Sequence, residues 1–281
     1  MRTAQRRNAA LCSNAHVRAL LGAAEVAAEK PRSRTRARKG WPLDVLCQDS
    51  SMKQGLDLNR VVLLGRTFEE YVQSFALIRD EYHGKSILDV AAGVSSFTAE
   101  ANTKGLKAIA FDPIYDLPAD KIEMRSRQDL DFVADAIGGL KVYRWDFYKD
   151  PEGMRRFRDR AWRTFLADYK QHGKERYVAG HLPQTPFRDG QFHLVLVSYL
   201  LFVYQDQLSY QLHKDAVLEL MRVTSGELRI YPTVTFEARP SEYLDRLRAD
   251  PELAHLRFET VKTEFEFLAN SNSFLRVRRC G

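Results

Sequence analysis

One segment, residues 86–113, constrains this chain more than any other, because it reads as a strand, a tight turn, a helix, a second strand and an acid. Residues 87–90 form an apolar run typical of a buried strand. The run leads into the small residues Ala91, Ala92 and Gly93, which allow a ligand to approach the backbone without a bulky side chain in the way. This order of elements is the first half of a nucleotide-binding unit.

The rest of the segment fits the same unit. Either Ser95 or Ser96 can cap a helix that ends at Gly105, where a left-handed C-terminal residue is expected. The next strand ends at Asp112, which follows Asp89 by 23 residues. An acid at about this separation, roughly 20 residues, accepts hydrogen bonds from ribose hydroxyls in nucleotide-binding folds.

The loop contains a single glycine, whereas a dinucleotide pyrophosphate needs about three for close approach. The segment instead resembles the first motif of class I S-adenosylmethionine-dependent methyltransferases, although that motif usually has two or three glycines. The resemblance implies S-adenosylmethionine as cofactor. It places Asp89, Ala91, Ala92, Gly93 and Asp112 among the cofactor-binding residues.

A second passage carries the same resemblance. Residues 182–198 are similar to the leucine, proline, phenylalanine, turn and strand passage of these methyltransferases. The nearly continuous apolar run 192–197 is typical of a central parallel strand that is covered on both faces. Ser198 and Tyr199 follow this strand, so we expect them to face the active cleft. Ser198 is assigned to the cofactor and Tyr199 to orienting a substrate.

The remaining pattern completes an α/β fold. Apolar residues at helical spacing predict a helix over 208–223 that Gly226 ends. Strands are predicted over 227–234, 258–267 and 273–278, the last two as a C-terminal hairpin. We expect a three-layer Rossmann-like methyltransferase sandwich, with a mostly parallel seven-stranded sheet and an antiparallel C-terminal hairpin.

Residues 113–176 are too long for an ordinary connection between the second and third strands. Charged amphipathic helices are predicted over 119–137 and 152–170, with a strongly aromatic segment, 142–148, between them. Two interpretations stay open. The segment is a helical insert that acts as a lid over the substrate, or it is a pair of covering helices with a core aromatic cluster.

His181 is the first candidate for a catalytic base. It follows Gly180, where the methyltransferases often have an acid that contacts the adenine amine, so His181 is either a cofactor contact or a base in the cleft. Two other histidines are expected to have no catalytic role. We expect His213 at the surface beside an apolar helix face, and His193 as a structural residue within its strand.

The net charge of +6 lies entirely in residues 1–51, which hold ten lysines and arginines and four acids. The remaining chain, 52–281, has 33 of each sign. We expect the first part to be a disordered basic extension, with a transit peptide or an RNA-contacting arm as alternatives. A neutral body argues against a nucleic acid substrate.

No stretch approaches the roughly 20 apolar residues of a membrane span. The three cysteines, Cys12, Cys47 and Cys280, lack the paired spacing of a metal site, and no metal ligand set is predicted. These features favour a cytoplasmic protein with a small-molecule acceptor as partner.

Three functions remain open at this point. The first is methyl transfer from S-adenosylmethionine to a small-molecule acceptor. The second keeps the cofactor and transfers its aminocarboxypropyl group, as some relatives of the class do. The third is a non-catalytic cofactor-binding or scaffold protein that has lost the glycine-rich loop.

Overall fold

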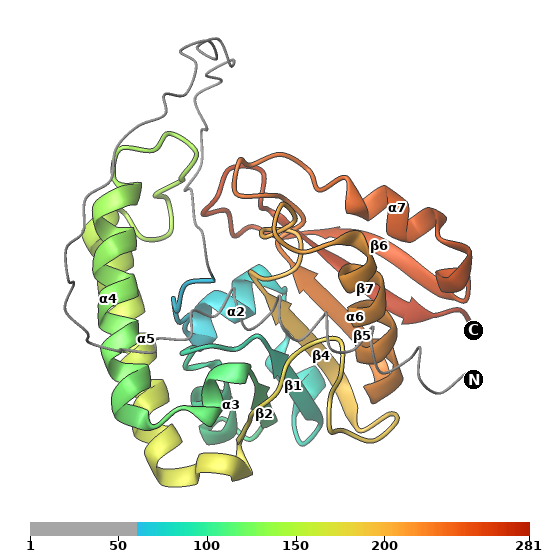
Figure 1. The fold of residues 1–281 in the computed structure, drawn as a ribbon, viewed down its shortest axis with the longest axis horizontal. Coiled ribbons are helices and arrows are strands. Elements are labelled where there is room, and N and C mark those ends of the chain that lie inside the picture. The colour runs from blue at the N-terminus through green and yellow to red at the C-terminus, as the bar shows by residue number, and fades with distance from the viewer. Residues whose placement is uncertain (1–60) are drawn as a thin grey trace, which may run out of the picture. The chain divides into compact units, whose positions relative to one another are not determined.

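A computed structural model describes residues 61–281, and residues 62–281 form one compact unit (Figure 1). The expectation for residues 1–51 therefore lies outside the described residues. Within residues 61–281, no helix combines the length and the apolar composition needed to cross a bilayer.

A seven-stranded sheet forms the centre, in the order β3-β2-β1-β4-β5-β7-β6 (Figure 1). Neighbouring strands are parallel from β3 to β5, whereas β7 is antiparallel to both β5 and β6. This arrangement confirms the predicted Rossmann-like methyltransferase fold. The strands are β1 (Ser86–Val90), β2 (Lys107–Phe111), β3 (Tyr177–Val178), β4 (Phe192–Ser198), β5 (Thr224–Tyr231), β6 (Leu256–Lys262) and β7 (Ser273–Arg279).

Helices cover both faces of the sheet. The α-helices are α2 (Phe68–Ser74), α3 (Phe97–Thr103), α4 (Ala119–Ile137), α5 (Pro151–His172), α6 (Tyr210–Val223) and α7 (Tyr243–Ala249). Short 3-10 helices are η1 (Arg79–Tyr82), η2 (Pro113–Asp116), η3 (Gly173–Glu175) and η4 (Pro251–Leu253).

Alternation along the central strands divides the core into two layers. Leu88 and Val195 pack with α6 and α7, whereas Ile87 and Leu194 belong to a cluster that includes α2 and α3. Successive side chains of a strand point to opposite faces, so each central strand feeds both layers. The apolar runs in the sequence follow from this double burial.

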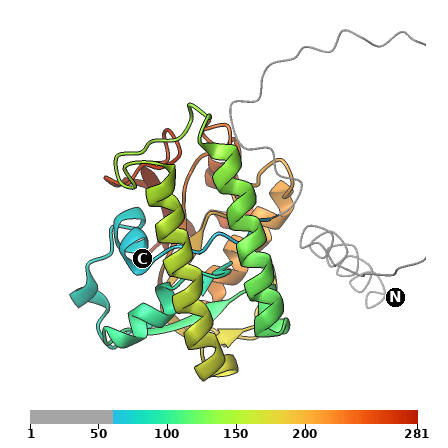
Figure 2. The same ribbon diagram turned by 90° about the vertical axis from the view of Figure 1, so that its left-hand side faces the viewer.

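Helices α4 and α5 lie side by side in opposite directions, next to the β3 edge of the sheet (Figures 1 and 2). Their apolar sides share a cluster that includes Ile122, Trp162 and Phe165. The bounds of α4 match the prediction. Helix α5 begins one residue earlier than predicted, because Asp150 caps it by accepting a hydrogen bond from the backbone N–H of Gly153. The helix ends two residues later than predicted.

Several details of the predicted secondary structure are wrong. Gly226 does not end a helix but lies in β5, where a Cβ would come within 2.2 Å of the His193 carbonyl oxygen. Strand β6 ends at Lys262, well before residue 267. Neither Ser95 nor Ser96 caps α3 through its side chain. Each error involves a contact with a residue distant in sequence or a competing side-chain partner.

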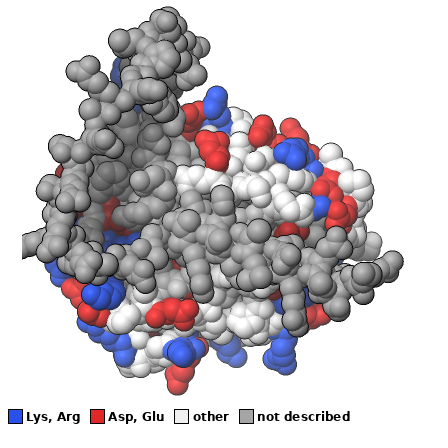
Figure 3. Space-filling model, in the orientation of Figure 1, with Lys and Arg blue, Asp and Glu red and all other residues white. Residues whose placement is uncertain are grey.

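Basic and acidic side chains are interspersed on the part of the described surface that is visible in Figure 3. No large field of one sign appears on that visible part. The view is consistent with the even charge balance of residues 52–281 in the sequence.

Candidate functional site at the carboxyl ends of the strands

The loop after β1 and the acid after β2 meet directly. Asp112 accepts a hydrogen bond from the backbone N–H of Gly93 through Oδ2 at 3.0 Å, and another from Ile114 through Oδ1 at 2.9 Å. Burial raises the pKa of Asp112 to about 6, against the effect of these two hydrogen bonds. A carboxylate in this position retains lone pairs for hydroxyl donors.

The loop itself has a left-handed backbone. Ala91 and Gly93 both have φ of about +54°, which is unfavourable for alanine and readily adopted by glycine. A Cβ on Gly93 would find Leu63 Cδ2 as its nearest neighbour, at 3.9 Å, so the space beside this glycine is open. Ala92 is buried in the apolar cluster that includes Leu63.

Asp89 lies at the end of β1 and is completely buried. Its Oδ1 accepts a hydrogen bond from the hydroxyl of Tyr71 at 2.9 Å, whereas Oδ2 has no hydrogen-bond partner. Burial, followed by the proximity of Asp112, raises the pKa of Asp89 well above its ordinary value. A buried carboxylate oxygen without a donor destabilises the folded protein, and a ligand that donates a hydrogen bond would remove this cost.

A segment before α2 crosses over this loop, and the sequence did not point to it. The backbone N–H of Arg66 donates to Ser95 Oγ at 3.0 Å, and the Arg66 carbonyl accepts from the backbone N–H of Ser96 at 2.9 Å. A Cβ on Gly65 would lie 2.2 Å from the carbonyl oxygen of Val94, so only glycine permits the crossing. Ser95 and Ser96 thus hold this segment instead of capping α3 through their side chains.

The sequence contains a local signal for the start of α2. Thr67 and Glu70 form a capping box, in which each side chain bonds to the backbone N–H of the other. This box fixes the point where the crossing segment turns into a helix. Arg66 immediately precedes this capping box, so the box fixes the position of the Arg66 backbone.

The end of β4 lies beside the end of β1. Val197 is paired in register with Val90, and Ser198 with Tyr231 of β5. Ser198 is buried. Tyr199 has φ of +51°, a strained value for a residue with a side chain, and the Arg66 guanidinium carbon lies 3.5 Å from its ring centroid.

His181 follows β3 through Gly180, whose missing side chain leaves room for the Phe111 ring; a Cβ there would lie 2.5 Å from it. The imidazole is half-buried, with Nδ1 at 3.2 Å from the carbonyl oxygen of Leu182. No described contact joins His181 to Asp112 or Tyr199. The backbone N–H of Asp112 donates to the carbonyl oxygen of Val178, three residues before His181. The structure thus brings Asp89, Gly93 and Asp112 together, and His181 follows the neighbouring strand.

His213 is not a surface residue, contrary to expectation. It is completely buried in α6, with its ring 5.7 Å from Phe202 and 4.8 Å from Tyr243. Helix α7 and the loop after β4 cover the position, which the spacing within α6 alone does not reveal.

A buried ionic cluster links α2 to α5. Glu70 accepts hydrogen bonds from Arg158 and from the Tyr148 hydroxyl, and Arg158 Nη2 donates to the Tyr148 hydroxyl at 2.7 Å. Arg158 also donates to the carbonyl oxygen of Gly65 at 3.2 Å, so the cluster supports the crossing segment. Burial opposes ionisation of Glu70, but Arg158 and the hydrogen bonds lower its pKa below the ordinary value.

The aromatic segment 142–148 packs like a core. Tyr143 and Tyr148 are buried, and their rings lie 4.9 and 4.8 Å from that of Phe267. Trp145 is half-buried and lies 5.5 Å from the same ring. Phe267 belongs to the loop between β6 and β7, which explains why the strand predicted there ends early.

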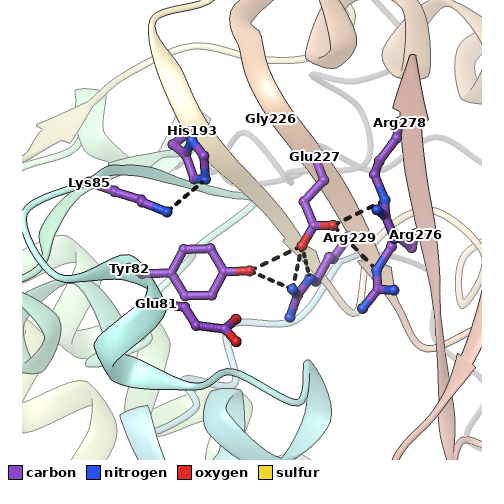
Figure 4. A pocket seen from close by; sticks show the side chains of 9 residues that line it. All are labelled: Glu81, Tyr82, Lys85, His193, Gly226, Glu227, Arg229, Arg276 and Arg278. Carbon is purple, nitrogen blue, oxygen red and sulfur yellow. Dashed lines mark hydrogen bonds and ion pairs between the residues drawn. The ribbon is translucent and has the colours of Figure 1, made fainter. Parts of the chain in front are cut away.

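A hollow of about 490 Å³ lies at the opposite, amino end of the strands (Figure 4). Glu227 occupies its centre and interacts with Arg229, Arg276, Arg278 and the Tyr82 hydroxyl (Figure 4). Burial opposes ionisation of Glu227, but Arg229 and its other partners lower its pKa. Every oxygen of this carboxylate is paired, so the hollow is an ionic junction of η1, β5 and β7.

The carboxyl-end site fits a ligand that carries hydroxyl and ammonium donors. Asp112 already occupies the N–H of Gly93, and a phosphate there would face a carboxylate instead of free donors. Asp89 Oδ2 lacks a donor. An adenosine ribose and an α-amino group supply donors of these kinds, so the residues present fit S-adenosylmethionine.

Comparisons with known proteins find similarity by sequence and by fold. No protein-family model matches the chain. Solved structures with a similar fold include a putative S-adenosylmethionine-dependent methyltransferase from Methanococcus maripaludis, with 13% identity over 76% of this chain and 84% of that chain and a TM-score of 0.37. Another is the magnesium protoporphyrin IX methyltransferase of Synechocystis, with 11% identity over 76% and 80% of the two chains and a TM-score of 0.40.

A relative by sequence is the uncharacterized protein MJ0045 of Methanocaldococcus jannaschii. It is 38% identical over 226 residues, which cover 80% of this chain and 99% of that protein. Identity at this level over nearly the whole length of the relative shows common descent. The chain belongs to the same family as MJ0045.

Proposed function

We propose that this protein is an S-adenosylmethionine-dependent methyltransferase that acts on a small-molecule acceptor. One observation carries the proposal: the Asp112 carboxylate is fixed to the N–H of Gly93, next to a buried Asp89 oxygen that has no donor. Two acids at the ends of adjacent parallel strands, with a left-handed loop between them, suit a ribose and an amino acid group.

In this proposal, Asp112 binds the ribose hydroxyls and Asp89 binds the α-ammonium group. Ala91, Ala92 and Gly93 form the wall on which the cofactor lies, with Ser198 at the end of the neighbouring strand. When bound, S-adenosylmethionine would supply an electrophilic methyl group. The chain's own contribution is alignment of the acceptor and exclusion of water.

Tyr199 is the group of the chain that we assign to orienting the acceptor. Burial raises the pKa of Tyr199, so its phenol stays protonated near neutral pH and acts as a hydrogen-bond donor or acceptor but not as a base. His181 remains a candidate for cofactor contact or proton acceptance. Residues 113–176 follow Asp112 directly, and we assign them to the acceptor side.

Calorimetric titration of the purified protein with S-adenosylhomocysteine tests the proposal. Asp112→Ala should weaken binding by about 1–3 kcal/mol, because it leaves ribose hydroxyls without their acceptor. The matched control is Asp116→Ala, since Asp116 is exposed four residues later, and it should bind like the wild type. A folded wild-type protein that binds neither this compound nor S-adenosylmethionine would refute the proposal.

A further inference from the structure

The guanidinium of Arg66 has an unused edge. Its Nη1 donates to the carbonyl oxygen of Leu64 at 3.1 Å, whereas Nε is buried without a hydrogen-bond partner. Among residues 61–281, no carboxylate forms an ion pair with Arg66. A buried N–H of a cation that lacks an acceptor costs free energy, so its retention calls for an explanation.

The unused edge has a defined chemistry. Nε–H and one N–H of Nη2 point in the same direction, and together they match the two oxygens of a carboxylate. The bond to Leu64 engages Nη1 and leaves the Nε and Nη2 edge available. A planar anion with two oxygens is therefore the ligand that this side chain is arranged to bind.

Arg66 is also held in place. Its backbone is bonded on both sides to the loop after β1, through Ser95 and Ser96. Its guanidinium stacks on Tyr199, which follows β4. The positive charge of Arg66 opposes the effect of burial on the pKa of Asp89, so the two groups share one region of the site.

We propose that Arg66 binds the α-carboxylate of the S-adenosylmethionine amino acid group, while Asp89 binds its α-ammonium. This inference rests on the proposed function. A guanidinium beside a cofactor that already carries sulfonium and ammonium charges would repel it unless an anion intervened. The α-carboxylate is the anion that the cofactor itself contains.

The test uses two probes that share the adenosine and thioether. S-adenosylhomocysteine has the amino acid group, whereas 5′-methylthioadenosine lacks it. Arg66→Gln should weaken S-adenosylhomocysteine binding about 10- to 100-fold, the value of losing a charge-assisted hydrogen-bonded pair. Its affinity for 5′-methylthioadenosine should stay within about twofold of the wild-type value, since that probe makes no contact with the guanidinium.

Two further variants sharpen the result. Arg66→Lys keeps the charge without the paired donors, so its affinity for S-adenosylhomocysteine should fall between those of wild type and Arg66→Gln. Arg79→Gln, at an exposed arginine of η1, is the matched control and should bind both probes normally. Thermal melting of each variant reports whether its fold is intact.

The outcomes separate this inference from the proposed function. If the wild type binds both probes and Arg66→Gln weakens both equally, or weakens neither, the carboxylate assignment is wrong and the cofactor site stands. Tighter S-adenosylmethionine binding by Arg66→Gln would also overturn it, because it would show repulsion of the sulfonium. A wild-type protein that binds neither probe would overturn the proposed function and this assignment together.

Discussion

Buried carboxylates have opposite environments at the two ends of the parallel strands. At the amino end, Glu227 is surrounded by arginines and a tyrosine hydroxyl, and its pKa is lowered. At the carboxyl end, Asp89 has one oxygen without a donor, and burial raises the pKa of both Asp89 and Asp112. The acid at the amino end is fully paired and lies in a hollow of about 490 Å³.

The difference distinguishes an acid that stabilises the fold from acids that can bind a ligand. A carboxylate whose partners all come from the protein stabilises the fold and leaves nothing for a ligand. A buried acid that lacks a donor destabilises the free protein and is accounted for if a ligand supplies that donor. Left-handed backbone at Ala91, Gly93 and Tyr199 lies at the carboxyl end as well.

The largest effect is expected at the amino end. Glu227→Gln leaves the buried Arg229 without its charge partner, which should cost about 3–5 kcal/mol of unfolding free energy. Urea unfolding measures this loss. Glu259→Gln, at a more exposed partner of Arg276 and Arg278, is the control and should cost less than about 1 kcal/mol. Affinity for S-adenosylhomocysteine should not change in either variant. Weaker binding by Glu227→Gln in a folded protein would contradict the assignment of Glu227 to the fold alone.

A smaller effect is expected where the aromatic segment meets the ionic cluster. Tyr148→Phe removes the hydroxyl between Glu70 and Arg158 and should cost about 1–3 kcal/mol of unfolding free energy. Cofactor affinity should remain unchanged, because this hydroxyl contributes to the buried ionic cluster and not to the cofactor site. A stable variant with impaired turnover of an acceptor would instead assign Tyr148 to a lid over the substrate.

The smallest effect concerns pH. Asp112 has a pKa of about 6 in the folded protein and an ordinary value of 3.8, so between these values the folded state holds the proton more tightly. Its contribution to unfolding free energy should therefore fall as the pH rises from about 4 to 6. Affinity for S-adenosylhomocysteine should rise over the same window, by at most about tenfold per pH unit, because the carboxylate is the better acceptor.

Comparison of wild type with Asp112→Asn at each pH isolates this contribution from those of other acids. Both pH dependences should be reduced in the variant. Identical profiles for the two proteins would remove Asp112 from the binding equilibrium.

Much of the fold was predictable because its signals are local. The apolar run of β4, the helical spacing of α4 and the turn after β1 each depend on residues a few positions apart. The predicted bounds of α4, Ala119–Ile137, match the structure. Asp89, Gly93 and Asp112 were predicted as one site from the resemblance of residues 86–113 to the methyltransferase motif. In the structure Gly93 bonds to Asp112, and Asp89 lies close enough to Asp112 for their charges to interact.

The rest depends on contacts between distant segments. Gly226 is required by the His193 backbone on the neighbouring strand, and His213 is buried by α7. Arg66 belongs to the site only because its segment crosses the loop after β1. No periodicity within a short window contains this information, so the sequence pattern missed these positions.

Asp89→Asn tests the central claim most directly, because it changes the group that distinguishes the two ends. The amide can still accept the hydrogen bond from Tyr71 but carries no charge for an ammonium group. Calorimetry should show S-adenosylhomocysteine binding weakened at least about tenfold, the value of one charge-assisted hydrogen bond, with unfolding free energy at pH 7 equal to or above that of wild type. Unchanged affinity together with a large loss of stability would contradict the account, because Asp89 would then be a structural acid like Glu227.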